Sequence, residues 1–214
     1  PILDINTAPP DKDEIKKAIN SLKPGKAAGP DDIPPEALKA TNDISSAMME
    51  KLLKKVWTTE TVPEDWKDGH LTVLPKKGDL TICDNSRGIM LLSVPGKVMC
   101  KVILERLKNA VDKKLRKNQA GFRSGRSCAD QIVSLRIIIE QALEQRYPCY
   151  INFVDYRKAF DSLDRKTLWK ILAHYGIPKK LISLIKSIYE NPKTKVLYKG
   201  KLSAAFLIET GVRQ

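Results

Sequence analysis

Long apolar runs and paired cysteines are both missing from this sequence. No apolar stretch approaches the roughly 18 residues that a membrane-spanning helix needs, and the N-terminal residues show no signal-peptide pattern. The four cysteines lie far apart and include no Cys-x-x-Cys pair. This spacing argues against a zinc site or a disulfide framework and favours a reducing compartment. We therefore expect neither a membrane protein nor a secreted protein held together by disulfides.

Acidic residues are few relative to basic ones. Thirty-eight Lys and Arg face 25 Asp and Glu, which gives a net charge of +13 and a pI near 9.6. Such a charge favours a polyanionic partner such as nucleic acid or a membrane surface, although a merely soluble basic protein stays an alternative. The first residue is Pro rather than Met, so the sequence looks like an excised piece. At 214 residues and 42% hydrophobic content, the chain can bury a substantial core.

Hydrophobic periodicity predicts a helical, basic N-terminal two-thirds followed by a compact strand-helix-hairpin unit. Ser127 and Asp130 form a capping-box pattern before one helix, and Asp161 or Ser162 should cap another. The predicted helices span 14–22, 36–39, 44–57, 95–115, 132–143, 163–172 and 180–189. The predicted strands span 66–74, 88–92, 149–154, 194–198 and 202–209, and the first two should pair through a charged turn at 76–79.

The stretch 151–161 is the most informative part of the sequence. A run of strand formers ends at Asp155, where a carboxylate would face a crevice of the kind that binds metals and phosphates in α/β proteins. A lone Asp binds Mg²⁺ poorly, however, and a cap on a following helix explains Asp155 nearly as well. Both interpretations stay open on this segment alone. Capping and surface pairing explain Asp161 and Asp164 adequately.

Six short segments occur in a recognisable order. They are 29–36 (GPDDIPPE), 74–79 (LPKKGD), 87–92 (RGIMLL), 119–126 (QAGFRSGR), 153–161 (FVDYRKAFD) and 211–214 (GVRQ). In order and spacing they resemble the reverse transcriptases of non-LTR (LINE-type) retrotransposons, and the resemblance spans nearly the whole chain. It implies a mixed α/β (α+β) right-hand polymerase fragment, mostly helical, with a fingers β-hairpin and an incomplete palm sheet. Residues 1–145 would be the fingers region with N-terminal extension helices, and residues 146–214 a partial palm.

The same resemblance implies a catalytic and metal-binding role for the end of the predicted strand. Asp155 would be the first of three catalytic aspartates that bind two Mg²⁺ ions, and the backbone carbonyl of Tyr156 would assist one ion. Phe160 would be the steric gate whose ring crowds a ribose 2′-hydroxyl and so selects deoxynucleotides. Ordinary core packing stays an alternative for Phe160.

Further positions would hold the substrates. The residues implied to bind the incoming dNTP are Lys76, Arg87 and Gln214, together with Tyr156 and Phe160. Arg123 and Arg126, in a glycine-punctuated loop, would position template and nucleotide. For Lys76 and Arg87 the alternative is a solvated charge. For Arg123 and Arg126 it is a surface loop with two unengaged arginines. Gly88 and Ser124 depart from the prolines common in the family, which affects loop stiffness rather than chemistry.

The implied activity is RNA-directed DNA synthesis, with an RNA template, a DNA primer, dNTPs and Mg²⁺. No membrane and no obligate protein partner is indicated, and the expected location is intracellular, in the nucleus, the cytoplasm or both. The pair of aspartates that the family carries further along is absent up to Gln214, so the fragment alone should not polymerise. A degenerate, inactive remnant that acts at most as a basic nucleic-acid-binding module stays an alternative, as does a group II intron-like or other cellular reverse transcriptase.

Overall fold

The structure is a computed structural model that describes residues 1–79, 81–82 and 85–213. The helices are α1 (Lys12–Asn20), α2 (Pro35–Ala40), α3 (Asn42–Thr59), α4 (Glu64–Lys67), α5 (Val94–Asp112), α6 (Cys128–Glu144), α7 (Arg165–His174) and α8 (Lys179–Ile188). The strands are β1 (Gly69–Pro75), β2 (Ser86–Leu92), β3 (Lys193–Tyr198), β4 (Lys201–Leu202) and β5 (Phe206–Leu207). Among the described helices, none has the length and apolar character of a membrane span.

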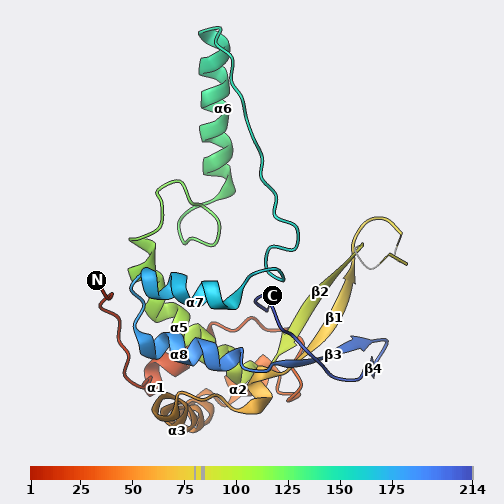
Figure 1. Cartoon of the computed structure of the whole chain (residues 1–214). Coiled ribbons are helices and arrows are strands. Elements are labelled where there is room, and N and C mark those ends of the chain that lie inside the picture. Colours follow the sequence, from red (N-terminus) through yellow and green to blue (C-terminus); the bar gives the residue numbers. More distant parts are fainter. Residues whose placement is uncertain (80, 83–84, 214) are drawn as a thin grey trace.

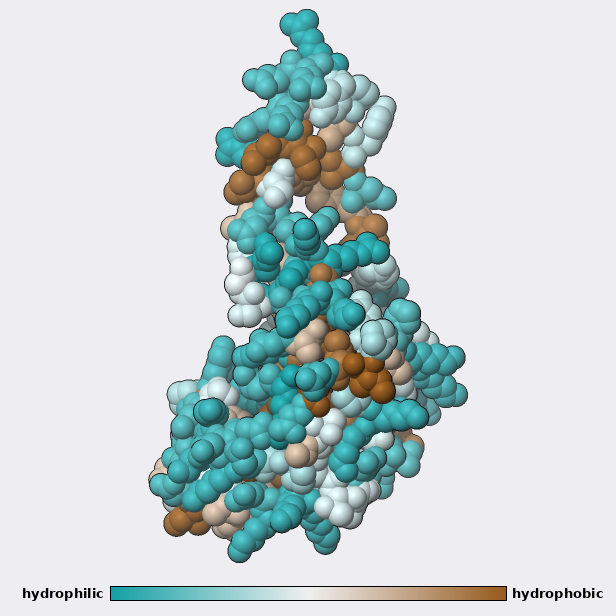
Figure 2. Space-filling model, turned by 90° about the vertical axis from the view of Figure 1, so that its left-hand side faces the viewer, coloured by the Kyte–Doolittle hydropathy of each residue, from teal (hydrophilic) through white to brown (hydrophobic). Residues whose placement is uncertain are grey.

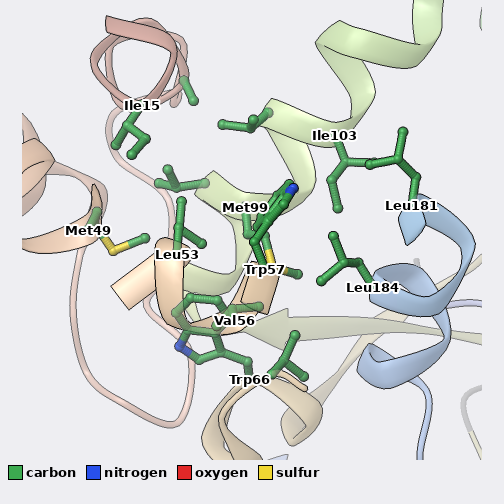
Figure 3. Close-up of a cluster of buried hydrophobic side chains, with 14 of the residues drawn as sticks. Ile15, Met49, Leu53, Val56, Trp57, Trp66, Met99, Ile103, Leu181 and Leu184 are labelled. Atoms are coloured by element: carbon green, nitrogen blue, oxygen red, sulfur yellow. The ribbon is translucent and has the colours of Figure 1, made fainter. Parts of the chain in front are cut away.

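The hydrophobic core lies between α1, α3, α5 and α8 (Figure 3). Trp57 and Leu53 of α3, Met99 of α5 and Leu181 of α8 are all completely buried. Burying each such large apolar side chain contributes about 1.5–3 kcal/mol. The helical spacing of these residues is the pattern that predicts their helices, so this part of the predicted fold is confirmed.

The five strands form one mixed sheet beside the helices (Figure 1). β1 pairs antiparallel with β2 from Gly69 opposite Leu92 to Pro75 opposite Ser86, which confirms the predicted hairpin. On its other edge β1 pairs parallel with β3, so strands from both ends of the chain share a sheet. The predicted return strand at 202–209 is divided into β4 and β5. It is interrupted at Ser203, whose hydroxyl accepts the N–H of Val196 (2.9 Å).

Helix α6 projects from the body together with the irregular segment that follows it (Figure 1). The predicted capping box at its start is confirmed, with the Ser127 N–H donating to Asp130 (3.0 Å). Apolar side chains gather on the projecting part (Figure 2), where Ile132 and Leu143 are 66% and 73% exposed. An apolar surface of this extent is typical of a face that another polypeptide covers.

The predicted strand at 149–154 is wrong, since these residues form no regular structure. A strand needs a neighbour that accepts and donates its backbone hydrogen bonds. Every strand of the described chain belongs to the sheet built on β1 and β3, and none pairs with this segment. Its side chains consequently extend into solvent, with Tyr150 93% and Phe153 81% exposed.

Two local predictions also need correction. Trp66 lies in the short helix α4 rather than in a strand, because its N–H donates to the carbonyl of Pro63 (3.0 Å) and β1 begins only at Gly69. The cap of α7 is Asp164 rather than Asp161 or Ser162. The division into regions at residues 145 and 146 stays a prediction.

Candidate functional site

Asp155 is exposed in an irregular segment, which is followed by turns at 157–162 and then by α7. It does not cap a following helix, because α7 begins at Arg165 and is capped by Asp164, which accepts the N–H of Thr167 (2.7 Å). Hydrogen bonds from the side chain and then the backbone of Thr167 hold the pKa of Asp164 below its ordinary value. Of the two interpretations of Asp155, the helix cap is therefore wrong, and the role as a metal ligand stays a prediction.

Phe160 is the point where three of the predicted site segments meet. Its ring makes an edge-to-face contact with Phe122 of the glycine-punctuated loop, with 6.0 Å between ring centroids. Its carbonyl accepts the N–H of Val212 (2.8 Å), in the segment near the C-terminus. Segments more than 35 positions apart in sequence thereby meet at Phe160, one at its ring and the other at its backbone carbonyl. Ordinary core packing does not describe Phe160, because its side chain stays partly exposed.

Gly211 fits closely against the chain that follows Phe160. Its N–H donates to the carbonyl of Leu163 (2.9 Å), and the hydroxyl of Thr210 donates to the carbonyl of Asp161 (3.1 Å). A Cβ atom at Gly211 would lie 2.5–2.7 Å from backbone atoms of Asp161, and the residue has φ +76°. Both observations require glycine, since a side chain would push the two segments apart.

Lys76 and Arg87 lie on the hairpin formed by β1 and β2. Arg87 is opposite Leu74, and the N–H of Lys76 extends the ladder to the carbonyl of Asn85 (2.8 Å). Because residues two apart in a strand share a face, this register directs both cations to the same side of the hairpin. Both are exposed. A point-charge Lys and a forked Arg on one face suit a polyphosphate.

Arg123 is engaged by the protein itself. Its guanidinium donates to both carboxylate oxygens of Asp112 at the end of α5 (2.5 and 3.1 Å) and to the carbonyl of Arg116 (3.0 Å). The hydrogen bonds from Arg123 lower the pKa of Asp112. Arg123 thus anchors the loop, and any effect on template or nucleotide would act through the loop. Arg126, in contrast, is exposed, and its role in positioning nucleic acid stays a prediction.

The remaining predicted positions are less defined. Gln214 lies outside the described residues, and Tyr156 is exposed beside Asp155. Within the part of the chain that the structure describes, no three His, Cys, Asp or Glu side chains come together as a metal site. The residues present therefore do not by themselves fit the two-metal centre that the sequence resemblance implies.

A cluster of Arg165, Tyr189 and Arg213 escaped the sequence prediction. Both guanidinium carbons lie 5.1 Å from the centroid of the Tyr189 ring. Arg213 belongs to one of the six recognised segments, but cation–aromatic contacts between positions 24 residues apart leave no local pattern in a sequence. Of the free cysteines, Cys100 lines the same pocket as Tyr189 and Arg213, whereas Cys128 begins α6 and Cys149 lies in the irregular segment after it.

The sequence of the chain is similar to sequences of known proteins. Residues 74–214 match the family model described as reverse transcriptase (RNA-dependent DNA polymerase). The chain is 26% identical over 202 residues to the transposon TX1 uncharacterized 149 kDa protein of Xenopus laevis. It is 26% identical over 186 residues to the retrovirus-related Pol polyprotein from type-2 retrotransposable element R2DM, and 28% identical over 206 residues to the RNA-directed DNA polymerase from mobile element jockey, both of Drosophila melanogaster.

These relatives are much longer than the present chain. The alignments cover 94%, 87% and 94% of this chain but only 15%, 17% and 22% of the three relatives, respectively. The R2DM protein is named after a retrotransposable element, and the jockey protein is named as the RNA-directed DNA polymerase of a mobile element.

Proposed function

Because the chain belongs to the reverse transcriptase (RNA-dependent DNA polymerase) family, we propose that it supplies the nucleotide-contacting fingers and the first catalytic aspartate of a retrotransposon polymerase. This polymerase copies an RNA template into DNA by extending a DNA primer with dNTPs. The observation that carries the proposal is the meeting of Phe122, Phe160 and Val212, which joins three predicted site segments at one residue, through the ring of Phe160 and through its backbone carbonyl.

Each site residue then has a role. Lys76 and Arg87, on one face of the hairpin, hold the incoming triphosphate, and Phe160 excludes the ribose 2′-hydroxyl. Gln214 contacts the same nucleotide. The net charge of +13 supports binding to the template–primer backbone, to which the exposed Arg126 contributes. We assign residues 1–145 to the fingers region and 146–214 to a partial palm.

Members of this family generally use divalent metal ions. We propose two Mg²⁺ ions for the complete active centre, with Asp155 giving one carboxylate and Tyr156 a backbone carbonyl. When bound, the ions would supply Lewis-acid activation of a primer 3′-hydroxyl and charge stabilisation of a pyrophosphate leaving group, and Asp155 and the Tyr156 carbonyl would help to hold them. The described residues form no three-ligand group, so Asp155 needs carboxylates from beyond them. We also propose an intracellular location, nuclear or cytoplasmic, where RNA templates and DNA are found.

RNA-templated primer extension by the full-length protein tests the catalytic assignment. Asp155→Asn should reduce extension by more than about 100-fold, because even partners of metal ligands commonly contribute 10- to 100-fold. Asp164→Asn is the matched control, since it changes a nearby carboxylate that caps α7. Full activity in Asp155→Asn would show that this aspartate is not a catalytic ligand.

A second candidate function is nucleic-acid binding without synthesis. The absence of a three-ligand metal group among the described residues, combined with the charge of +13, favours it. Both candidates predict binding of RNA and DNA that weakens steeply with salt, because phosphate contacts release counterions. Primer extension separates them: binding with no extension by the full-length protein would leave only the binding module.

A further inference from the structure

Arg165, the first residue of α7, binds the irregular segment 208–211 with its side chain, which contacts backbone carbonyls of that segment. Its guanidinium donates to the carbonyls of Gly211 (2.8 Å), Thr210 (3.1 Å) and Ile208 (3.0 Å). This segment has no strand partner here, so its carbonyls have no sheet ladder to satisfy them. A planar guanidinium with five donors can meet several carbonyls at once, which a Lys ammonium on a flexible stem does far less well.

Arg213 fixes the other end of the same segment. Its guanidinium donates to the carbonyl of Lys67 in α4 (2.6 Å) and to the carbonyl of Ile188 at the end of α8 (2.6 Å), with a longer contact to Trp66 (3.4 Å). The segment is thereby tied to α4, α7 and α8 together. These elements belong to the main body of the structure rather than to the projecting part (Figure 1).

Tyr189 lies between the two arginines. Each guanidinium carbon is 5.1 Å from the ring centroid, a cation–π distance at which the ring stabilises a desolvated cation. Desolvation lowers the pKa of both guanidinium groups, and within the described residues no carboxylate forms an ion pair with either. Removing two cations from water without a counter-charge costs desolvation free energy. Apolar residues of similar volume would fill the same space without that cost.

The geometry points to a positioning role: we propose that Arg165 and Arg213, stacked on Tyr189, clamp residues 208–213 against the backbone of Phe160 and Leu163 and so set the position of the gate ring. The N–H groups of Gly211 and Val212 make the connection, donating to the carbonyls of Leu163 and Phe160. This proposal rests on the proposed nucleotide site at Phe160. A loosened clamp lets the ring move, which weakens dNTP binding and discrimination between dNTP and rNTP.

Steady-state primer extension by the full-length protein tests this role. Arg165→Met should raise the dNTP KM by at least about 10-fold, with a smaller effect on kcat, and should lower dNTP-over-rNTP selectivity, because misplacement of a site by about 1 Å is costly. Arg165→Lys should restore little of the loss, and Tyr189→Phe should retain the wild-type KM because the ring remains. Arg136→Met on α6, which removes an exposed arginine paired with Glu140, is the matched control.

Hydrogen exchange in the chain itself gives an independent measurement that requires no activity. The amides of Gly211 and Val212 should exchange at least about 10-fold faster in Arg165→Met and Arg165→Lys than in wild type, while core amides of α5 keep their protection. If these two amides are unchanged, the clamp is disproved whatever the activity. If they respond but the wild-type protein shows no extension, the proposed function fails and the clamp stands. If extension is present and KM and selectivity do not change in Arg165→Met, the positioning role is disproved.

Discussion

The pairing of Arg106 with Glu14 predicts a large, pH-dependent contribution to stability. Arg106 in α5 is 5% exposed and donates to both carboxylate oxygens of Glu14 in α1 (2.8 and 2.6 Å). It also donates to the carbonyl of Ala8 (2.6 Å) and lies 5.7 Å from the ring centroid of Trp57. The pair therefore joins the N-terminal segment to the helix whose last residue, Asp112, anchors the loop of the site.

Arg106→Ala leaves the Glu14 carboxylate without its partner. Breaking a buried pair costs about 3–5 kcal/mol, and because Glu14 stays 30% exposed we expect the lower end, about 3 kcal/mol. With a urea m-value of about 2–3 kcal/mol/M, the unfolding midpoint should fall by about 1–1.5 M. Lys108→Ala, which removes an exposed ion pair with Glu105 on the same helix, should shift the midpoint by less than about 0.3 M.

The same pair makes stability depend on pH in a definite direction. The side-chain hydrogen bond from Arg106 is the largest cause that lowers the pKa of Glu14. The stability that it provides is therefore fully present above the unfolded carboxyl pKa of about 4.3, and is lost as pH falls through the lowered folded pKa. Glu14→Gln keeps an oxygen for the Asp11 N–H but removes the charge.

Urea titrations followed by tryptophan fluorescence at submicromolar protein concentration measure these effects. The difference between wild type and Glu14→Gln should be constant from pH 7 to about pH 5.5 and should shrink below pH 4. An undiminished difference at pH 3 would refute the electrostatic reasoning. An Arg106→Ala midpoint equal to that of Lys108→Ala would refute the magnitude.

Two further predictions concern the gate ring and the projecting part. Phe160→Val in the full-length protein should lower dNTP-over-rNTP selectivity at least about 10-fold in competitive primer extension. Phe122→Leu, at the ring beside it, should change the selectivity less. Unchanged selectivity in Phe160→Val would count against Phe160 as the gate. The chain should also associate through its exposed segment 128–156, since an unpaired, apolar stretch is a template for pairing. Phe153→Pro should reduce this association in light scattering relative to Phe206→Pro, and a monodisperse wild-type monomer would contradict it.

Sequence periodicity predicted the helices and the first hairpin because their signals are local. The capping box at Ser127 and Asp130 depends only on neighbours in the chain, as does the alternation at 66–74 that predicts the first strand of the hairpin. The strand at 149–154 shows the limit of this reasoning. Its residues have strong β propensity, but propensity cannot supply a partner strand, and no strand of the described chain pairs with this segment.

The geometry around the proposed site could be predicted only in part, for a comparable reason. Ordered segments indicate Phe160, Lys76 and Arg87, whose roles stay a prediction. The anchoring of Arg123 by Asp112 could not be predicted, because it depends on where α5 ends relative to the loop. The contacts of Arg165 with the carbonyls of 208–211 were equally hidden, since backbone acceptors carry no sequence signature.

The two most important residues of the site are held very differently, although only five positions separate them. The backbone of Phe160 is held through its carbonyl, which accepts the N–H of Val212, and its ring lies edge-to-face beside the exposed ring of Phe122. Asp155 lies beyond this fixed region, after a segment whose backbone has no strand partner among the described residues. Pairing of 149–154 with a neighbouring strand would therefore fix the position of the Asp155 carboxylate without moving Phe160. The proposed sugar selection at Phe160 and the proposed metal binding at Asp155 are thus structurally separable, so Phe160 variants and Asp155 variants should have additive effects on different kinetic constants.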